Sequence, residues 1–154
     1  MEEELKKLNE LSEYFRRINT KITLLKLIES AKSEYDKYHF EEAEKSLREG
    51  YTIDPKNSTI LRGLGCIEQF KGNYDKALEY YFSALEHSKT KEIELTLIGM
   101  AYYLQDKLDD SIKYFNHAID ANDNYPNAYE GRNQAMLENH LKIIDLQESL
   151  KKYF

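Results

Sequence analysis

The residues that could carry out chemistry are few in this sequence and lie far apart. The four histidines share no spacing typical of a metal site, such as His-Glu-x-x-His; they are His39, His87, His117 and His140. Cys66 is the single cysteine, and no histidine stands at a fixed position near it. A lone cysteine of this kind is typically a small packed or groove-lining thiol. We therefore expect no catalytic residue and no metal ligand.

Two short stretches match ligand-binding loops only in part. Gly63-Leu64-Gly65 lacks the third glycine of a dinucleotide motif, because Glu68 stands there, and it lies inside a predicted helix rather than after a strand. Residues 120–124 begin like a calcium loop, but Tyr125 replaces the required glycine and Gly131 the bidentate glutamate. The sequence predicts neither an enzyme nor a cofactor.

Large and small residues recur in register at intervals of 34 along most of the chain. The sets are Leu27, Leu61, Leu95 and Tyr129; Ala31, Gly65 and Gly99; Phe40, Tyr74 and Leu108; Ala43, Ala77 and Ser111; Leu47, Tyr81 and Phe115; and Gly50, Ala84 and Ala118. In the central copy, residues 61–68 and 74–85 each follow one helix face, and Lys71-Gly72-Asn73 predicts a turn between them. This period indicates an array of helical pairs.

Two glycines inside the predicted helices need an explanation. Glycine in a helix costs about 1 kcal/mol relative to alanine. We expect Gly65 and Gly99 to offset this cost by letting two helix backbones approach closely, with an aromatic ring filling the space beside them. Gly65→Leu should then lower the melting temperature sharply.

The pattern is similar to the tetratricopeptide repeat, whose motif runs aromatic, Leu-Gly, Tyr, Ala, aromatic, Ala, Pro. The residues that carry the likeness are Leu61, Leu64-Gly65, Tyr74, Ala77, Tyr81 and Ala84, with Asp54-Pro55 closing the preceding copy. The departures are Ser30, Glu34 and Gly50 in the first copy, Glu68 in place of a tyrosine, and Lys89 and Asp123 in place of the closing proline. The likeness covers about residues 24–136.

This resemblance implies an all-α fold, a right-handed α-solenoid that forms a single domain. It divides the chain into an N-terminal helix (1–23), three helix–turn–helix repeats (24–57, 58–91 and 92–125) and a C-terminal capping helix (126–154).

The resemblance also implies a concave groove, lined by the first helix of each repeat, that binds a peptide or helix of a partner protein. The phase of these helices predicts the groove residues Lys32, Tyr35, Arg62, Cys66, Gln69, Ile93, Thr96, Met100 and Tyr103, with Asn127, Glu130 and Gln134 extending the row. Ile93, Met100 and Tyr103 should form a hydrophobic slot, and Lys32 and Arg62 should add positive charge. For Tyr35 and Ile93, core packing between repeats is an equally good interpretation.

Some members of this family clamp the C-terminal carboxylate of a chaperone. They use Lys and Asn on the first helix, Asn on the third, and Lys and Arg on the fifth. The matching positions here are Ile28, Lys32, Gly63, Ile93 and Leu97, and none carries the required residue. Because charge-assisted carboxylate binding needs those donors, we expect no such clamp.

Apolar stripes also mark both ends of the chain. At the N-terminus the stripe is Leu8, Leu11, Phe15, Ile18, Ile22 and Leu25, with coiled-coil spacing. It either packs on the first repeat as a cap or joins two copies as a homodimer. The helix either runs on into the first repeat or is broken at Asn19-Thr20. At the C-terminus Arg132 and Asn133 favour a cap, and the stripe of Leu137, Leu141, Ile144 and Leu150 either packs back on the third repeat or stays partly exposed.

Composition limits the class of function. The 154 residues, 32% charged and 41% hydrophobic, suit one domain, and the net charge of −6 argues against nucleic acid. A single cysteine, no signal-peptide core and no apolar span predict a cytoplasmic protein without membrane insertion. The leading hypothesis is a non-enzymatic protein-interaction module. The alternatives are a homo-oligomeric scaffold assembled through the terminal helices, and a dedicated chaperone similar in layout to the tetratricopeptide chaperones of type III secretion.

Overall fold

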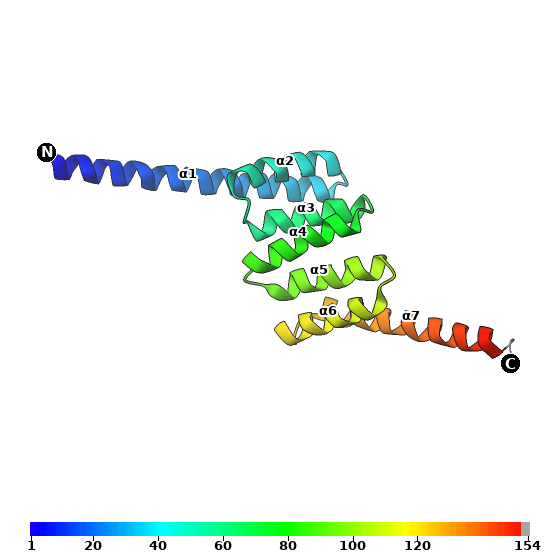
Figure 1. The fold of residues 1–154 in the computed structure, drawn as a ribbon. Coiled ribbons are helices and arrows are strands. Elements are labelled where there is room, and N and C mark those ends of the chain that lie inside the picture. Colours follow the sequence, from blue (N-terminus) through cyan, green and yellow to red (C-terminus); the bar gives the residue numbers. More distant parts are fainter. Residues whose placement is uncertain (152–154) are drawn as a thin grey trace.

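The computed structural model describes residues 1–151, which form seven α-helices and no strand. The helices are α1 (Glu2–Asp36), α2 (Phe40–Ile53), α3 (Ser58–Phe70), α4 (Tyr74–His87), α5 (Lys91–Leu104), α6 (Leu108–Ala121) and α7 (Pro126–Lys151). Each helix packs against the next, so the body is an elongated stack of helices (Figure 1). The predicted all-α helical-repeat fold is confirmed. Residues 152–154 of the expected C-terminal helix lie outside the described residues.

The first six helices form three pairs, α1 with α2, α3 with α4 and α5 with α6. In the second and third pairs, a large side chain of the second helix covers a small residue of the first helix. Tyr81 of α4 is fully buried, and a Cβ added to Gly65 of α3 would lie 2.4 Å from its ring. Phe115 of α6 covers Gly99 of α5 in the same way, with 3.0 Å to an added Cβ. The Phe115 ring also lies against Gly131 of α7, where the distance would be 2.4 Å. The helices therefore approach as closely as the glycine positions predict.

The turns inside the three pairs share an unusual backbone conformation. Tyr38, Gly72 and Asp106 follow the first helix of each pair at an interval of 34, and their φ angles are +64°, +81° and +63°. Only glycine adopts this left-handed region without a steric penalty. The repeat geometry thus imposes the same turn whether or not the sequence supplies a glycine.

The N-terminus of helix α3 is capped by the residue that precedes it. The side chain of Asn57 accepts hydrogen bonds from the backbone N–H groups of Thr59 (3.1 Å) and Ile60 (3.2 Å). These are donors that a helix leaves unsatisfied at its first turn. Asn57 is therefore the N-cap, and Ser58 is the first helical residue.

Helix α1 is one continuous helix that crosses the expected boundary at residue 23. Asn19-Thr20 does not break it, and the Thr20 and Thr23 hydroxyls donate to the carbonyl oxygens of Arg16 and Asn19 one turn back in the same helix. The 14 residues of α2 cover only the last part of the 35-residue α1, and the first part projects from the body (Figure 1). Leu8 and Phe15 are 64% and 56% exposed, so the interpretation of this stripe as a cap on the first repeat is wrong.

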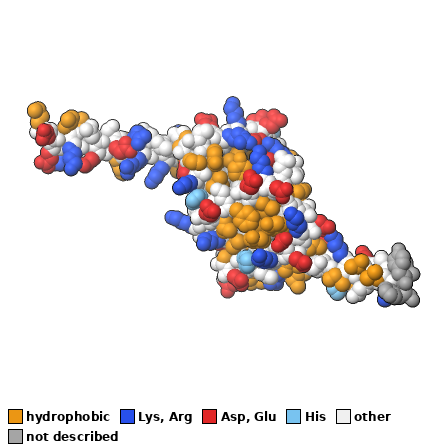
Figure 2. Space-filling view, viewed as in Figure 1, with side chains coloured by type: hydrophobic (Ala, Val, Ile, Leu, Met, Phe, Trp, Pro, Cys, Tyr) orange, Lys and Arg blue, Asp and Glu red, His pale blue; other side chains and the backbone are white. Residues whose placement is uncertain are grey.

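Helix α7 covers the third pair with its first half only. Ala128 and Ala135 are buried there, whereas Leu141 and Leu146 further along are 52% and 61% exposed. The C-terminal stripe therefore does not pack back on the body. The projecting parts of α1 and α7 leave the body at opposite ends, and hydrophobic side chains are visible on both (Figure 2). Within residues 1–151, none of the helices combines the length and the apolar character needed to cross a membrane.

Candidate functional site

The structure divides the predicted groove residues between two cavities. One cavity, which we call the α5–α7 pocket, includes Ile93, Thr96, Met100 and Tyr103. The other, the α1–α3 pocket, includes Lys32, Tyr35, Arg62 and Cys66. Gln69 lines neither of them, and its side-chain oxygen accepts a hydrogen bond from the Tyr81 hydroxyl (3.2 Å).

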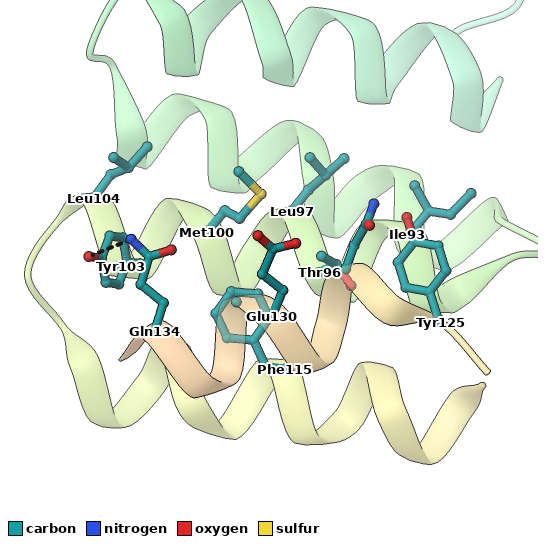
Figure 3. A pocket seen from close by; sticks show the side chains of 12 residues that line it. Ile93, Thr96, Leu97, Met100, Tyr103, Leu104, Phe115, Tyr125, Glu130 and Gln134 are labelled. Carbon is teal, nitrogen blue, oxygen red and sulfur yellow. Dashed lines mark hydrogen bonds between the residues drawn. The ribbon is translucent and has the colours of Figure 1, made fainter. Parts of the chain in front are cut away.

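The α5–α7 pocket has a volume of about 520 Å³ and largely apolar walls. Its apolar residues are Ile93, Leu97, Met100 and Leu104 of α5, Phe115 of α6, and Tyr125 just before α7. Thr96, Asn127, Glu130 and Gln134 add polar groups, mostly from α7 (Figure 3). Met100 and Leu104 are 42% and 45% exposed, so the apolar wall is open to a ligand.

Tyr103 lies at one end of this pocket and connects α5 to α7. Its hydroxyl donates to a carboxylate oxygen of Glu138 (2.5 Å) and accepts from the amide of Gln134 (3.2 Å), the second bond being drawn in Figure 3. The hydrogen bond to Glu138 raises the pKa of Tyr103, so the phenol stays protonated. Close by, Lys142 pairs with Asp106 in the turn before α6. These bonds hold the two helices that form the pocket at a fixed separation.

The α1–α3 pocket is smaller, about 390 Å³, and its charged residues are basic, whereas the charged residue of the α5–α7 pocket is acidic. It is lined by Ile28, Ala31, Lys32, Tyr35, Leu47, Thr59, Arg62, Gly63 and Cys66. Burial raises the pKa of the Cys66 thiol, whose sulfur lies 3.5 Å from the Tyr81 hydroxyl oxygen. The thiol is therefore protonated at neutral pH, and a nucleophilic thiolate is disfavoured.

Arg62 is already paired within the protein. Its Nε lies 3.6 Å from a carboxylate oxygen of Glu94, which is fully buried, and its Nη2 donates to the Thr59 hydroxyl (3.3 Å). Glu94 stands 34 residues after Ile60 and 34 before Ala128, two core residues that are also fully buried. Among the described residues its carboxylate accepts no hydrogen bond, so Arg62 is its main electrostatic compensation. Arg62 consequently joins α3 to α5 and is only in part available to a ligand.

Sequence reasoning missed five residues of the α5–α7 pocket: Leu97, Leu104, Phe115, Tyr125 and Gly131. Phe115 shares its register with Tyr81, so the periodicity assigned it to the core, yet its ring also forms part of the pocket floor. Tyr125 precedes Pro126, and proline at the first turn of α7 fixes where the chain enters that helix. The position of Tyr125 beside Pro126 was the one available signal. Nothing within residues 1–151 groups three or more His, Cys, Asp or Glu side chains as a metal site would.

Comparison with known proteins identifies the repeat. Residues 95–125 match a family model described as a tetratricopeptide repeat. The chain therefore contains a tetratricopeptide repeat at residues 95–125. It is 28% identical, over 110 residues, to anaphase-promoting complex subunit 7 of Dictyostelium discoideum. That alignment covers 71% of this chain but only 18% of the relative, so the chain spans less than a fifth of that protein.

Solved tetratricopeptide domains have the same fold. The first such domain of Spaghetti (RPAP3), bound to the HSP90 peptide SRMEEVD, superimposes with a TM-score of 0.70 at 15% identity, over 77% of this chain and 94% of that one. The Sgt2 domain from Aspergillus fumigatus also gives a TM-score of 0.70 at 15% identity, over 76% and 79% of the two chains. At these identities the likeness establishes the fold of the tetratricopeptide array alone.

Proposed function

We propose that this chain is a non-enzymatic protein-interaction module that binds a peptide or a helix of a partner protein on the face formed by α1, α3, α5 and α7. The observation that carries the proposal is the α5–α7 pocket, an open cavity with apolar walls and a polar rim. Its volume of about 520 Å³ falls within the usual range for ligand pockets. A structural neighbour bound to a peptide supports the same type of ligand.

The chemistry of the pocket favours side-chain recognition. Ile93, Leu97, Met100 and Leu104 offer apolar contact, and the flexible thioether of Met100 adapts to varied shapes. The pocket lining contains no Lys or Arg, so it lacks the donors that hold a terminal carboxylate. This composition supports an internal segment of the partner, rather than its C-terminus, as the ligand.

A display library of random peptides, selected on the immobilised full chain, tests this function. Met100→Asp places a charge in the apolar wall and should weaken the selected peptides about tenfold or more, because burying a methionine side chain contributes about 1.5–3 kcal/mol. Met136→Asp is the matched control, since Met136 is 51% exposed on α7 and lies outside the pocket. Equal binding by both variants, with unchanged melting temperatures, would show that the pocket is not the ligand site.

Self-association is a second candidate function, favoured by the projecting part of α1. Its apolar stripe has the three-and-four spacing of a coiled-coil seam and is exposed over most of its length. A second copy of the chain would bury this stripe. Deleting residues 1–20 should convert a dimer to a monomer in analytical ultracentrifugation while leaving peptide binding intact. A full-length chain that is monomeric at all concentrations would exclude this role.

A further inference from the structure

We propose that the α5–α7 pocket receives a lysine or arginine side chain of the partner. This inference rests on the proposed function and specifies the chemistry of the ligand. It follows from the combination of apolar walls with one carboxylate, that of Glu130, which extends across the cavity.

Glu130 is placed to meet a cation from outside the chain. It comes from α7, and its carboxylate extends toward Leu97 and Met100 on α5, in front of the Phe115 ring (Figure 3). Among residues 1–151 it forms no ion pair and no side-chain hydrogen bond, in contrast to Glu94 and Glu138, which have Arg62, Tyr103 and Lys142 as partners. The described side chains therefore leave the negative charge in the pocket without a cationic partner.

The apolar walls of the pocket suit the methylene stem of a lysine or arginine side chain. Lysine and arginine have an apolar stem of three or four methylene groups that packs on apolar surface while the charged end stays in a polar environment. Ile93, Leu97 and Met100 would contact the stem, and Glu130 would accept from the charged end. The side-chain oxygens of Asn127 and Gln134 can accept the remaining N–H groups.

Other side chains fit this pocket less well. A purely apolar residue would displace water from the Glu130 carboxylate without replacing its hydrogen bonds, which is costly. An acidic residue would meet the same carboxylate and be repelled. The α1–α3 pocket is lined instead by Lys32 and Arg62, so of these two pockets only the α5–α7 pocket favours a cation.

The experiment is a charge swap on the peptides selected from the display library. Wild type should select peptides with a Lys or Arg next to an aliphatic residue, and a synthetic consensus peptide with that cation changed to norleucine or glutamate should bind at least about fivefold more weakly. Glu130→Lys should weaken the original peptide about tenfold or more and restore binding to the glutamate peptide. Fluorescence anisotropy on the full chain measures each pair.

Glu49→Lys is the control, because Glu49 is exposed on α2 and lies outside the pocket. Selected peptides without enrichment of Lys or Arg, or a consensus peptide that binds Glu130→Lys as tightly as wild type, would overturn the assignment of a cation. If those peptides are still lost with Met100→Asp, the pocket remains the ligand site and only its chemistry is wrong. If no peptide is selected, or Met100→Asp changes nothing, the proposed function fails as well.

Discussion

Single residues set the spacing of the helices. Tyr81 and Phe115 are buried rings that lie where Gly65, Gly99 and Gly131 leave room, and an added Cβ would come within 2.4–3.0 Å of them. Helix propensity alone would favour alanine at each position by about 1 kcal/mol. The sign of the change in unfolding free energy on replacing glycine by alanine therefore shows whether the steric contact or helix propensity dominates.

We expect Gly65→Ala to destabilise the protein by about 1–3 kcal/mol, because the new methyl group forces the Tyr81 ring to move. Gly99→Ala should cost less, since its Cβ would be 3.0 Å from Phe115 rather than 2.4 Å from Tyr81. Thermal and denaturant unfolding measure both variants. A more stable Gly65→Ala protein would mean that propensity outweighs this contact.

Charged residues form a second structural group at the contact of α2 with α3 and α4. Glu44 accepts from Lys71 and Arg48, and the hydrogen bond from Lys71, above all, lowers the pKa of Glu44. Burial raises the pKa of Glu68, but the hydrogen bond from Asn73 (2.9 Å) and the nearby Lys76 outweigh burial and lower that pKa overall.

These lowered pKa values predict acid sensitivity. In the unfolded chain both carboxyls titrate near about 4.3, so the unfolded state binds protons first and stability falls as the pH drops below that value. Glu68→Gln should cost about 1.5–3 kcal/mol at pH 7, where the charge is hydrogen-bonded, and progressively less below pH ~4. Glu49→Gln, at an exposed site, should follow wild type throughout. A pH-independent difference between Glu68→Gln and wild type would refute this account.

At the scale of an element, the turn inside each helical pair carries backbone strain. Tyr38 and Asp106 adopt left-handed conformations that cost a side chain about 1–2 kcal/mol, whereas Gly72 occupies the same turn without that cost. Tyr38 is 78% exposed, so its side chain recovers little through burial.

Tyr38→Gly should therefore stabilise the protein by about 0.5–1 kcal/mol. This value is the backbone strain that is relieved minus the cost of the conformational entropy that glycine adds to the unfolded chain. Gly72→Ala is the reciprocal test and should destabilise by a similar amount. An added Cβ there would meet nothing within 4 Å, so only φ decides the outcome. Equal melting temperatures for wild type and both variants would exclude strain as a factor.

At the scale of the whole molecule, the projecting part of α1 is the surface through which we propose that two copies associate. The residues that flank its apolar stripe at the coiled-coil e and g positions include Lys7, Lys21 and Lys26 but no acidic residue. In a parallel pair, Lys21 of one copy would lie opposite Lys26 of the other. Charge repulsion therefore opposes the hydrophobic gain.

Self-association should consequently strengthen as salt is added, because salt screens exposed charges. Lys21→Glu should strengthen association at low salt and weaken its dependence on salt, whereas Lys45→Glu on α2 should not. Sedimentation velocity at low and high ionic strength measures these effects. Association that weakens with salt would point to a different surface.

The sequence by itself determined the periodic part of the molecule. The interval of 34 residues predicted the helical pairs, and the small residues at positions 65 and 99 predicted where helices touch, because both follow from helix geometry and local packing. It also predicted most residues of the α5–α7 pocket, since a groove residue is defined by its phase on a helix.

Only the tertiary structure decided what depends on contacts between distant residues. The pairing of Arg62 with Glu94 joins positions 32 residues apart, and no local pattern specifies such a pair. The division of the predicted row between two pockets also depends on how the helices pack. The sequence likewise did not determine whether the apolar stripes at the two ends of the chain are buried or exposed. Whether Leu8 or Leu146 packs or projects depends on whether another helix is long enough to cover it, and none of the helices within residues 1–151 is.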